Sequence, residues 1–249
     1  CLSMLAIALE LARHEPVYED MASKFLEHFV AIADAINAID GIGLWHEEDG
    51  CYYSLYNPPE RYRASTPIRV KHYTNLWPLW VGITPPDRAK RVIENLLLKE
   101  NEFRCPFGIR SMAMSETHFN NSTTGFNNPM PSAPQFGPVD ESGSSNWQGP
   151  LWPVPTWLGV MALRRYGYEE DARRLGEDYL EFLADRIDRD GMFYENYHSE
   201  TGEPLHAKGI GSWYMLMPAL LDEDAMELFA NVDHRTSNVE RRMGEGHHE

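Results

Sequence analysis

The sequence predicts an all-α fold, because apolar residues recur at helical spacing through much of its 249 residues. The predicted helices come in consecutive pairs, and Asp-Gly turns follow two of the long ones, at Asp49-Gly50 and Asp190-Gly191. Helix pairs whose loops carry the chemistry are typical of an (α/α)6 barrel. About eight helical segments are expected in all, fewer than the six helix pairs of a complete (α/α)6 barrel. The barrel would therefore be incomplete at its N-terminus. The predicted helices are 1–14, 17–38, 75–81, 84–98, 154–166, 169–187, 209–221 and 222–230.

Local signals set several helix boundaries. Glu15-Pro16 separates the first two helices, because proline cannot continue a helix. Thr84-Pro85-Pro86 is typical of a helix start, where proline is favoured in the first turn. Gly167 is expected to end the helix over residues 154–166. In the second helix the residues expected to face the core are Met21, Phe25, Phe29, Ile32 and Ile36.

The composition argues against several classes of partner. A net charge of −16 disfavours nucleic acid and anionic membranes, and no apolar run is long enough to span a bilayer. There is no secretion signal, and Cys1, Cys51 and Cys105 form neither a disulfide framework nor a zinc pattern. The acidic run His46–Asp49 matches no metal-ligand template. We therefore expect a cytoplasmic protein with free thiols, no metal and no cofactor.

The chain begins at Cys1, inside a helical pattern and without a helix cap. We therefore expect it to be the C-terminal part of a longer protein. Residues 1–232 are expected to form part of one folded domain, and residues 233–249 a polar tail.

The segment over residues 99–150 is rich in Asn, Ser, Pro and Gly and shows no helical period. A long irregular segment in a compact domain is usually functional or disordered, and its aromatic residues argue against disorder. We expect it to cover a site. Glu116 and Asp140 are candidate site carboxylates, although ordinary surface is the better interpretation of either one alone.

Glu195 is the central candidate for catalysis. It lies in the aromatic and polar stretch Asp190–Gly202, which begins with Asp-Gly and ends with Thr-Gly and is expected to be a loop. Acid–base chemistry needs a carboxyl group among groups that bind substrate and exclude water. The stretch Asp49–Asn57 repeats the same Asp-Gly-apolar-aromatic-Tyr pattern, with Ser54 in the place of Glu195. A repeated unit with one copy specialised for chemistry is our interpretation; a solvated loop glutamate and chance similarity are the alternatives.

A second stretch, Ser145–Pro155, places Trp147 and Trp152 beside Gln148 just before a predicted helix. Proline fixes the backbone there, and Gly149 permits another segment to approach its backbone closely. Flat apolar rings beside an amide suit a sugar, whose C–H face stacks and whose hydroxyls need hydrogen-bond partners. A rigid turn with buried tryptophans is the alternative.

Four segments together resemble the C-terminal part of the catalytic domain of glycoside hydrolase family 63 and its mannosylglycerate-hydrolase-like relatives. The two later motifs carry the resemblance: Asn146–Pro153 is similar to the family's aromatic-Trp-x-Gly-Pro-x-Trp-Pro, and Glu195–Gly202 to its Glu-x-Tyr-x-x-x-Thr-Gly. Asn146 departs from the family pattern, which has an aromatic residue there. Gly43–Gly50 and Cys1–Leu11 are also family-like, so the resemblance covers most of residues 1–221.

The resemblance implies an inverting, exo-acting glycosidase that removes α-linked glucose or mannose from oligosaccharides or small glycosylated acids. Glu195 would be the general base that activates water. The general acid would be an aspartate upstream of these residues, and Glu116, Asp140 or Glu141 could only substitute for it. The residues expected to bind the carbohydrate substrate are Trp147, Gln148, Trp152, Tyr197 and Trp213.

Two other functions stay open from the sequence. In a binding module, the aromatic pocket would grip sugar without cleaving it, and binding would survive Glu195→Gln. In a structural scaffold, the tryptophans would be core residues, and Trp147→Ala would destabilise the fold by leaving a cavity.

Overall fold

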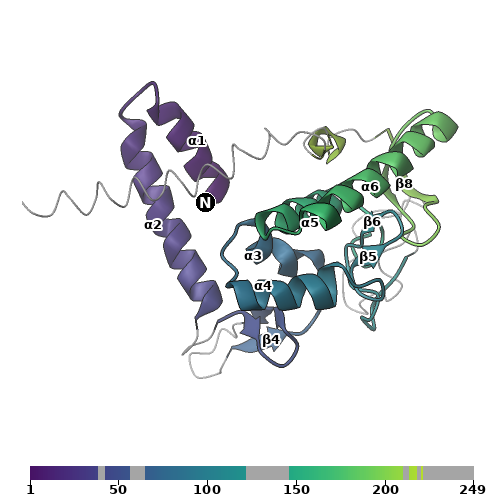
Figure 1. The fold of residues 1–249 in the computed structure, drawn as a ribbon, viewed down its shortest axis with the longest axis horizontal. Coiled ribbons are helices and arrows are strands. Elements are labelled where there is room, and N and C mark those ends of the chain that lie inside the picture. The colour runs from purple at the N-terminus through teal and green to yellow at the C-terminus, as the bar shows by residue number, and fades with distance from the viewer. Residues whose placement is uncertain (39–42, 57–64, 122–145, 210–212, 218–219, 221–249) are drawn as a thin grey trace, which may run out of the picture. The chain divides into compact units, whose positions relative to one another are not determined.

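The computed structural model describes most of the chain, in two compact units (Figure 1). One unit contains residues 1–45 and 222–249, and the other contains residues 46–221. The predicted polar tail and the predicted helix over residues 222–230 lie outside the described residues, as do Asp140 and Glu141. The described residues are 1–38, 43–56, 65–121, 146–209, 213–217 and 220.

The first unit is built on the helices α1 (Leu2–Ala12) and α2 (Tyr18–Asn37), which pack against each other. Both helices and the break at Glu15-Pro16 confirm the sequence prediction. The predicted buried face of α2 is only partly right. Ala22 and Leu26 are its buried residues, whereas Met21 and Ile32 are 44% and 47% exposed.

Helices also dominate the second unit. The helix α5 begins at Pro153, as expected for proline in a first turn. Gly167, with φ of +78°, lies in the short connection to α6, and the two helices pack against each other as a hairpin. Within the predicted helix over residues 209–221, residues 213–216 form a 3-10 turn. The elements are η1 (Tyr73–Leu76), α3 (Trp77–Trp80), α4 (Pro86–Val92), the π-helical turn η2 (Ile93–Leu97), α5 (Pro153–Arg165), α6 (Glu169–Asp190) and η3 (Trp213–Leu216).

The all-α fold class does not include the short strands of this structure, which pair into two-stranded sheets. Strands of two to five residues show too few side chains for a period of two to appear in the sequence. The pairs are β1 (Trp45–His46) with β2 (Cys51–Tyr52), β3 (Ser54–Tyr56) with β4 (Thr66–Ile68), β5 (Arg104–Cys105) with β6 (Gly108–Ile109), and β7 (Tyr194–Tyr197) with β8 (Pro204–Lys208).

The stretch Asp190–Gly202 was predicted to be a loop, and this is wrong for Glu195 itself but right for the residues on either side of its strand. Asp190 is the last residue of α6, Gly191 ends the helix with φ of +71°, and Glu195 lies in the strand β7. Tyrosines favour the extended backbone, and β8 supplies an antiparallel partner. The earlier copy is only partly alike: Gly50 also has a positive φ, of +62°, but it lies in the turn between β1 and β2 and not at a helix end, and the hairpin of β3 and β4 follows. The two copies therefore share a hairpin after the Asp-Gly pair, while the helix that leads directly into this pair is present only in the second copy.

None of the helices that the structure describes is long and apolar enough to cross a membrane.

Candidate active site

The two sequence motifs meet through backbone hydrogen bonds at Leu151. This fully buried residue donates its N–H to the carbonyl of Tyr197 at 2.8 Å, and the N–H of Tyr197 donates back to the carbonyl of Leu151 at 3.1 Å. Leu151 directly precedes Trp152, and Tyr197 lies two residues after Glu195. The strand that carries the carboxylate is therefore held against the tryptophan motif.

Further segments continue this row of paired backbone. The N–H of Ser111 donates to the carbonyl of Pro150 at 3.0 Å, and the N–H of Tyr73 donates to the carbonyl of Ser111 at 2.9 Å. The hydroxyl of Ser111 also accepts the N–H of Gly149 at 3.1 Å. These hydrogen bonds bring together residues that are far apart in the chain. We call the paired backbone segments at Tyr73, Ser111, Pro150–Leu151 and Tyr197 the frame of the site.

An aromatic stack stands beside this frame. The rings of Trp147 and Trp152 lie 3.7 Å apart between centroids and are inclined by 15°. Tyr73 stacks on Trp147 at 5.2 Å and 28°. Trp147 therefore lies between the other two rings, and the stack runs from the fully buried Trp152 to the half-buried Trp147 and Tyr73. Because both faces of Trp147 are covered by neighbouring rings, a ligand can contact only the edge of its ring.

Trp152 and Tyr197 have no exposed surface in this structure. The indole N–H of Trp152 donates to the carbonyl of Asn146 at 2.7 Å, which fixes the ring from behind. Tyr197 packs edge-on against Phe182 at 5.0 Å. Both side chains support the site from the core, whereas sequence reasoning expected them to line it.

The tight turn before the stack depends on Gly149. A side chain on Gly149 would come within 2.8 Å of the ring of Phe119 and 2.9 Å of the carbonyl of Asn120. This confirms the predicted close approach of another segment to the backbone of Gly149. Asn146 turns its buried amide inward, where Oδ1 accepts the N–H of Gln148 at 2.8 Å.

Three partly exposed side chains at this turn and stack have polar groups without a partner among the described residues. The side chains of Tyr73, Trp147 and Gln148 form no hydrogen bond with other residues in the described part of the chain, and all three are partly exposed. They are suitable partners for the hydroxyl groups of a sugar.

Two tyrosines fix the backbone immediately before Glu195. The hydroxyl of Tyr197 accepts the N–H of Tyr194 at 3.0 Å, and the hydroxyl of Tyr214 donates to the carbonyl of Tyr194 at 2.5 Å. Glu195 itself is half-buried. Sequence reasoning chose Trp213 on this turn, but Trp213 is 41% exposed, whereas its neighbour Tyr214 is buried and contacts the strand.

Sequence reasoning also missed His72 and Tyr73. The ring of His72 lies 4.6 Å from that of Tyr73, and its side chain bonds to the backbone of Trp147. Burial lowers the pKa of His72, and the bond to Trp147 only partly opposes this. The signal in the sequence was faint, because Tyr73 lies far from Trp147 along the chain and only long-range backbone pairing joins them.

The pKa of His72 predicts a pH-dependent stability. Because folding lowers this pKa, the unfolded chain binds a proton first as pH falls through about 6.5, and the folded state is destabilised. The stabilisation is complete above that pH and is lost as pH falls towards the lower folded-state value. We expect urea unfolding to give a smaller drop in free energy between pH 7.5 and 5.5 for His72→Gln than for the native chain. The exposed His14, changed to Gln, should leave the drop unaltered; equal drops in all three proteins would contradict the assignment.

The other candidate carboxylates have structural partners. Glu116 accepts the N–H of Lys71 at 3.0 Å. In the acidic run, Asp49 accepts a bidentate ion pair from Arg69 at 2.9 and 2.7 Å, and Glu47 pairs with Arg91. Arg69 is the main cause that lowers the pKa of Asp49. These groups stabilise turns.

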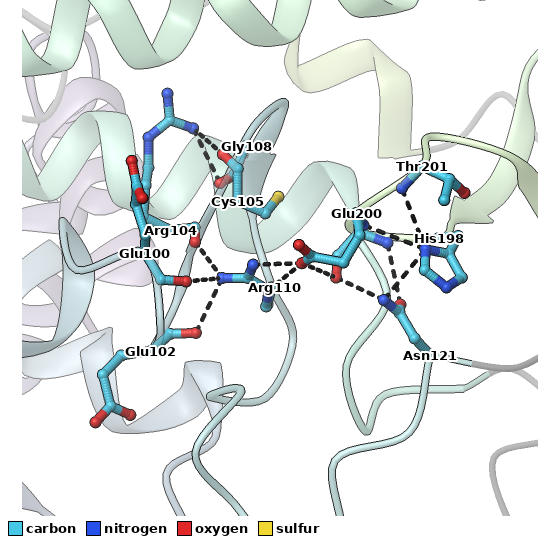
Figure 2. A network of polar contacts seen from close by, with 11 residues as sticks. Glu100, Glu102, Arg104, Cys105, Gly108, Arg110, Asn121, His198, Glu200 and Thr201 are labelled. Atoms are coloured by element: carbon cyan, nitrogen blue, oxygen red, sulfur yellow. Dashed lines mark hydrogen bonds and ion pairs between the residues drawn. The ribbon is translucent and has the colours of Figure 1, made fainter.

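A cavity of about 580 Å³ lies elsewhere in the second unit, and its lining includes neither Trp147 nor Glu195. Charged side chains of both signs line it, including Arg104, Arg110 and Glu200. Part of its wall is the ion pair between Arg110 and Glu200 (Figure 2). Glu200 belongs to the turn that follows β7.

Partly exposed aromatic rings next to the amide of Gln148 suit carbohydrate chemistry, and the match to a family model places the chain among the glycoside hydrolases. Residues 4–213 match the family model described as the mannosylglycerate hydrolase MGH1-like glycoside hydrolase domain, and the chain belongs to this family. The resemblance stated from the sequence is confirmed.

Individual proteins show the same relationship. The Saccharomyces cerevisiae protein YMR196W is 30% identical over 66% of this chain and 21% of its own length. The glucosylglycerate hydrolase of Mycolicibacterium hassiacum is 46% identical, over 24% of this chain and 12% of its own length.

A solved structure shows the fold. The GH63 mannosylglycerate hydrolase of Thermus thermophilus, in complex with glucose, superposes with a TM-score of 0.57 at 20% identity over 87% of this chain and 44% of that one. The helical architecture predicted from the sequence therefore agrees with that of a known relative. The chain spans about a fifth of the length of the curated relatives that it matches first.

Proposed function

We propose that the protein is an inverting, exo-acting glycosidase that hydrolyses α-linked glucose or mannose, with Glu195 as the general base. The observation that carries the proposal is the pairing of Leu151 with Tyr197, which holds the strand of Glu195 against the aromatic stack. In this assignment Glu195 takes a proton from water as that water attacks the anomeric carbon of the sugar.

The sugar would be bound by the partly exposed groups around the stack. Trp147 offers its edge and indole N–H, and Gln148 and Tyr73 offer polar groups to hydroxyls. Trp213 is exposed on the turn that holds the strand and can form another part of the wall. Trp152 and Tyr197 would act indirectly, by keeping Trp147 and Glu195 rigid.

Inversion also needs a protonated carboxylic acid on the other side of the bond, roughly 6.5–9.5 Å from the base, so that a water molecule fits between. We assign this acid to a residue of the enzyme upstream of this chain. Glu116 is a poor substitute because it already accepts the backbone N–H of Lys71.

The substrate is proposed from what the relatives are named for. One is a hydrolase of glucosylglycerate and another of mannosylglycerate, and the latter was solved with glucose. We therefore propose a hexosyl group on a small hydroxy acid as the substrate, with an oligosaccharide as the alternative.

The test is hydrolysis of glucosylglycerate, mannosylglycerate and simple α-glucosides and α-mannosides, followed by NMR of the first sugar released. We expect the β anomer to appear first, because inversion places the incoming water opposite the departing α-linked group. Release of the α anomer would exclude the inverting mechanism. Sugar binding without hydrolysis by the full-length protein would favour the binding-module function.

A further inference from the structure

A buried arginine connects the turn after Glu195 to a neighbouring loop (Figure 2). Arg110 is only 2% exposed. Its Nη1 donates to the carbonyls of Glu100 at 2.7 Å and Glu102 at 3.2 Å, and also to that of Arg104. Its Nε and Nη2 both donate to Oε1 of Glu200, the first at 3.1 Å. Almost the whole guanidinium is therefore used, which holds its position firmly.

The backbone of the same arginine belongs to the frame of the site. Arg110 faces Leu151 in an antiparallel bridge, and Leu151 faces Tyr197 in the next one. The chain then runs from Tyr197 through the turn to Glu200, whose carboxylate returns to the side chain of Arg110. Together they form a closed ring of contacts, from Arg110 through Leu151, Tyr197 and Glu200 back to Arg110, and this ring of contacts contains the end of strand β7.

The turn within this ring is rigid. His198 Nδ1 accepts the N–H groups of Glu200 and Thr201, both at 3.2 Å. The amide of Asn121 holds Ser199 at both ends: Oδ1 accepts its N–H at 3.0 Å, and Nδ2 donates to its hydroxyl at 2.9 Å (Figure 2). A rigid turn transmits a constraint at Glu200 back to the strand.

The place of Glu200 is not forced by packing, because its side chain is 41% exposed. An exposed carboxylate ordinarily stays in water, since a surface ion pair contributes little to stability. Here its partner is the buried guanidinium of Arg110. The ion pair therefore links the two segments that pair with Leu151, one at Arg110 and one at Tyr197.

We infer that Arg110 and Glu200 are positioning residues for the general base: their ion pair sets how strand β7, and with it Glu195, lies relative to Trp147 and Trp152. This inference rests on the proposed function, in which Glu195 is the base. A displacement of about 1 Å at a reacting group can lower the rate by about a hundredfold, even when the altered residue is far from the chemistry.

The kinetic test is Glu200→Ala in the full-length enzyme. We expect kcat to fall by about ten- to a hundredfold and KM to change by less than about twofold, because the sugar-binding groups stay in place while the base shifts. Glu200→Gln, which keeps an acceptor oxygen, should lose less. Glu203→Gln is the matched control: Glu203 lies in the same turn and 3.6 Å from Arg186, outside the ring of contacts.

A purely structural role would give a different result. It would lower the thermal midpoint of Glu200→Ala and leave kcat of the folded enzyme unchanged, and this outcome would overturn the inference. If Glu195→Gln itself leaves turnover intact, the proposed function fails first, and the kinetic effect of Glu200 is then no evidence about a base.

A second measurement needs no turnover. Hydrogen exchange of the Leu151 and Tyr197 amides reports the pairing of β7 with the tryptophan motif. We expect Glu200→Ala and Arg110→Lys to exchange faster at both amides than the native chain, and Glu203→Gln to exchange at the native rate. Equal rates in all four proteins would refute the role of the ion pair, whatever the activity.

Discussion

Replacing Glu195 by glutamine is expected to lower kcat by about 10²–10⁴-fold, the usual contribution of a general base. Glutamine has nearly the same shape as glutamate, but its amide cannot take the proton from the attacking water. The backbone around the residue should stay in place, because Tyr197 and Tyr214 hold Tyr194 through its N–H and its carbonyl. KM and sugar affinity should therefore change little.

The measurement is steady-state hydrolysis of the preferred substrate by the two proteins, together with sugar binding by calorimetry. Glu181→Gln, the same change on the exposed side of α6, serves as the control and should keep full activity. Unchanged turnover in Glu195→Gln would eliminate Glu195 as the base. Loss of both turnover and sugar affinity would instead indicate that the carboxylate binds the sugar directly.

The long helices α1, α2, α5 and α6 could be predicted from the sequence because each is long enough for its apolar period to repeat. The helix α5 also had proline at its start and glycine after its end. The hairpin of β7 and β8 could not be predicted in this way, because its first strand has only four residues. Its partner strand lies beyond a turn whose order comes from the imidazole of His198 and from Asn121, contacts that no local pattern encodes.

The candidate site could be predicted only in part, because long-range contacts are not encoded in any local sequence pattern. Two local motifs were visible because their residues are adjacent in the chain, and the structure joins them through Leu151 and Tyr197. The place of Tyr73 on Trp147 depends on pairing across Ser111, which sequence spacing does not reveal. Trp213 and Tyr214 show a second limit, since neighbouring side chains on a turn point in different directions and the sequence does not say which one faces the strand.

Replacing Trp152 by alanine is expected to destabilise the protein by about 3–5 kcal/mol, the range for removing a large aromatic side chain from a core. Its ring is completely buried and lies 3.7 Å from that of Trp147, so truncation would leave a cavity beneath the stack. The carbonyl of Asn146 would also lose the indole N–H that it accepts at 2.7 Å. Urea unfolding measures the loss, with Trp77→Ala, at 46% exposure, as a control expected to cost about 1 kcal/mol or less.

Trp152→Phe separates the two contributions of this residue. Phenylalanine keeps an aromatic ring under Trp147 but cannot donate to Asn146, so its stability should lie between those of the native chain and Trp152→Ala. Sugar affinity should follow the same order, because Trp147 can hold its edge towards a ligand only while a ring supports it from below. If Trp152→Ala proves as stable as Trp77→Ala, the role of Trp152 as the core residue that supports Trp147 is contradicted.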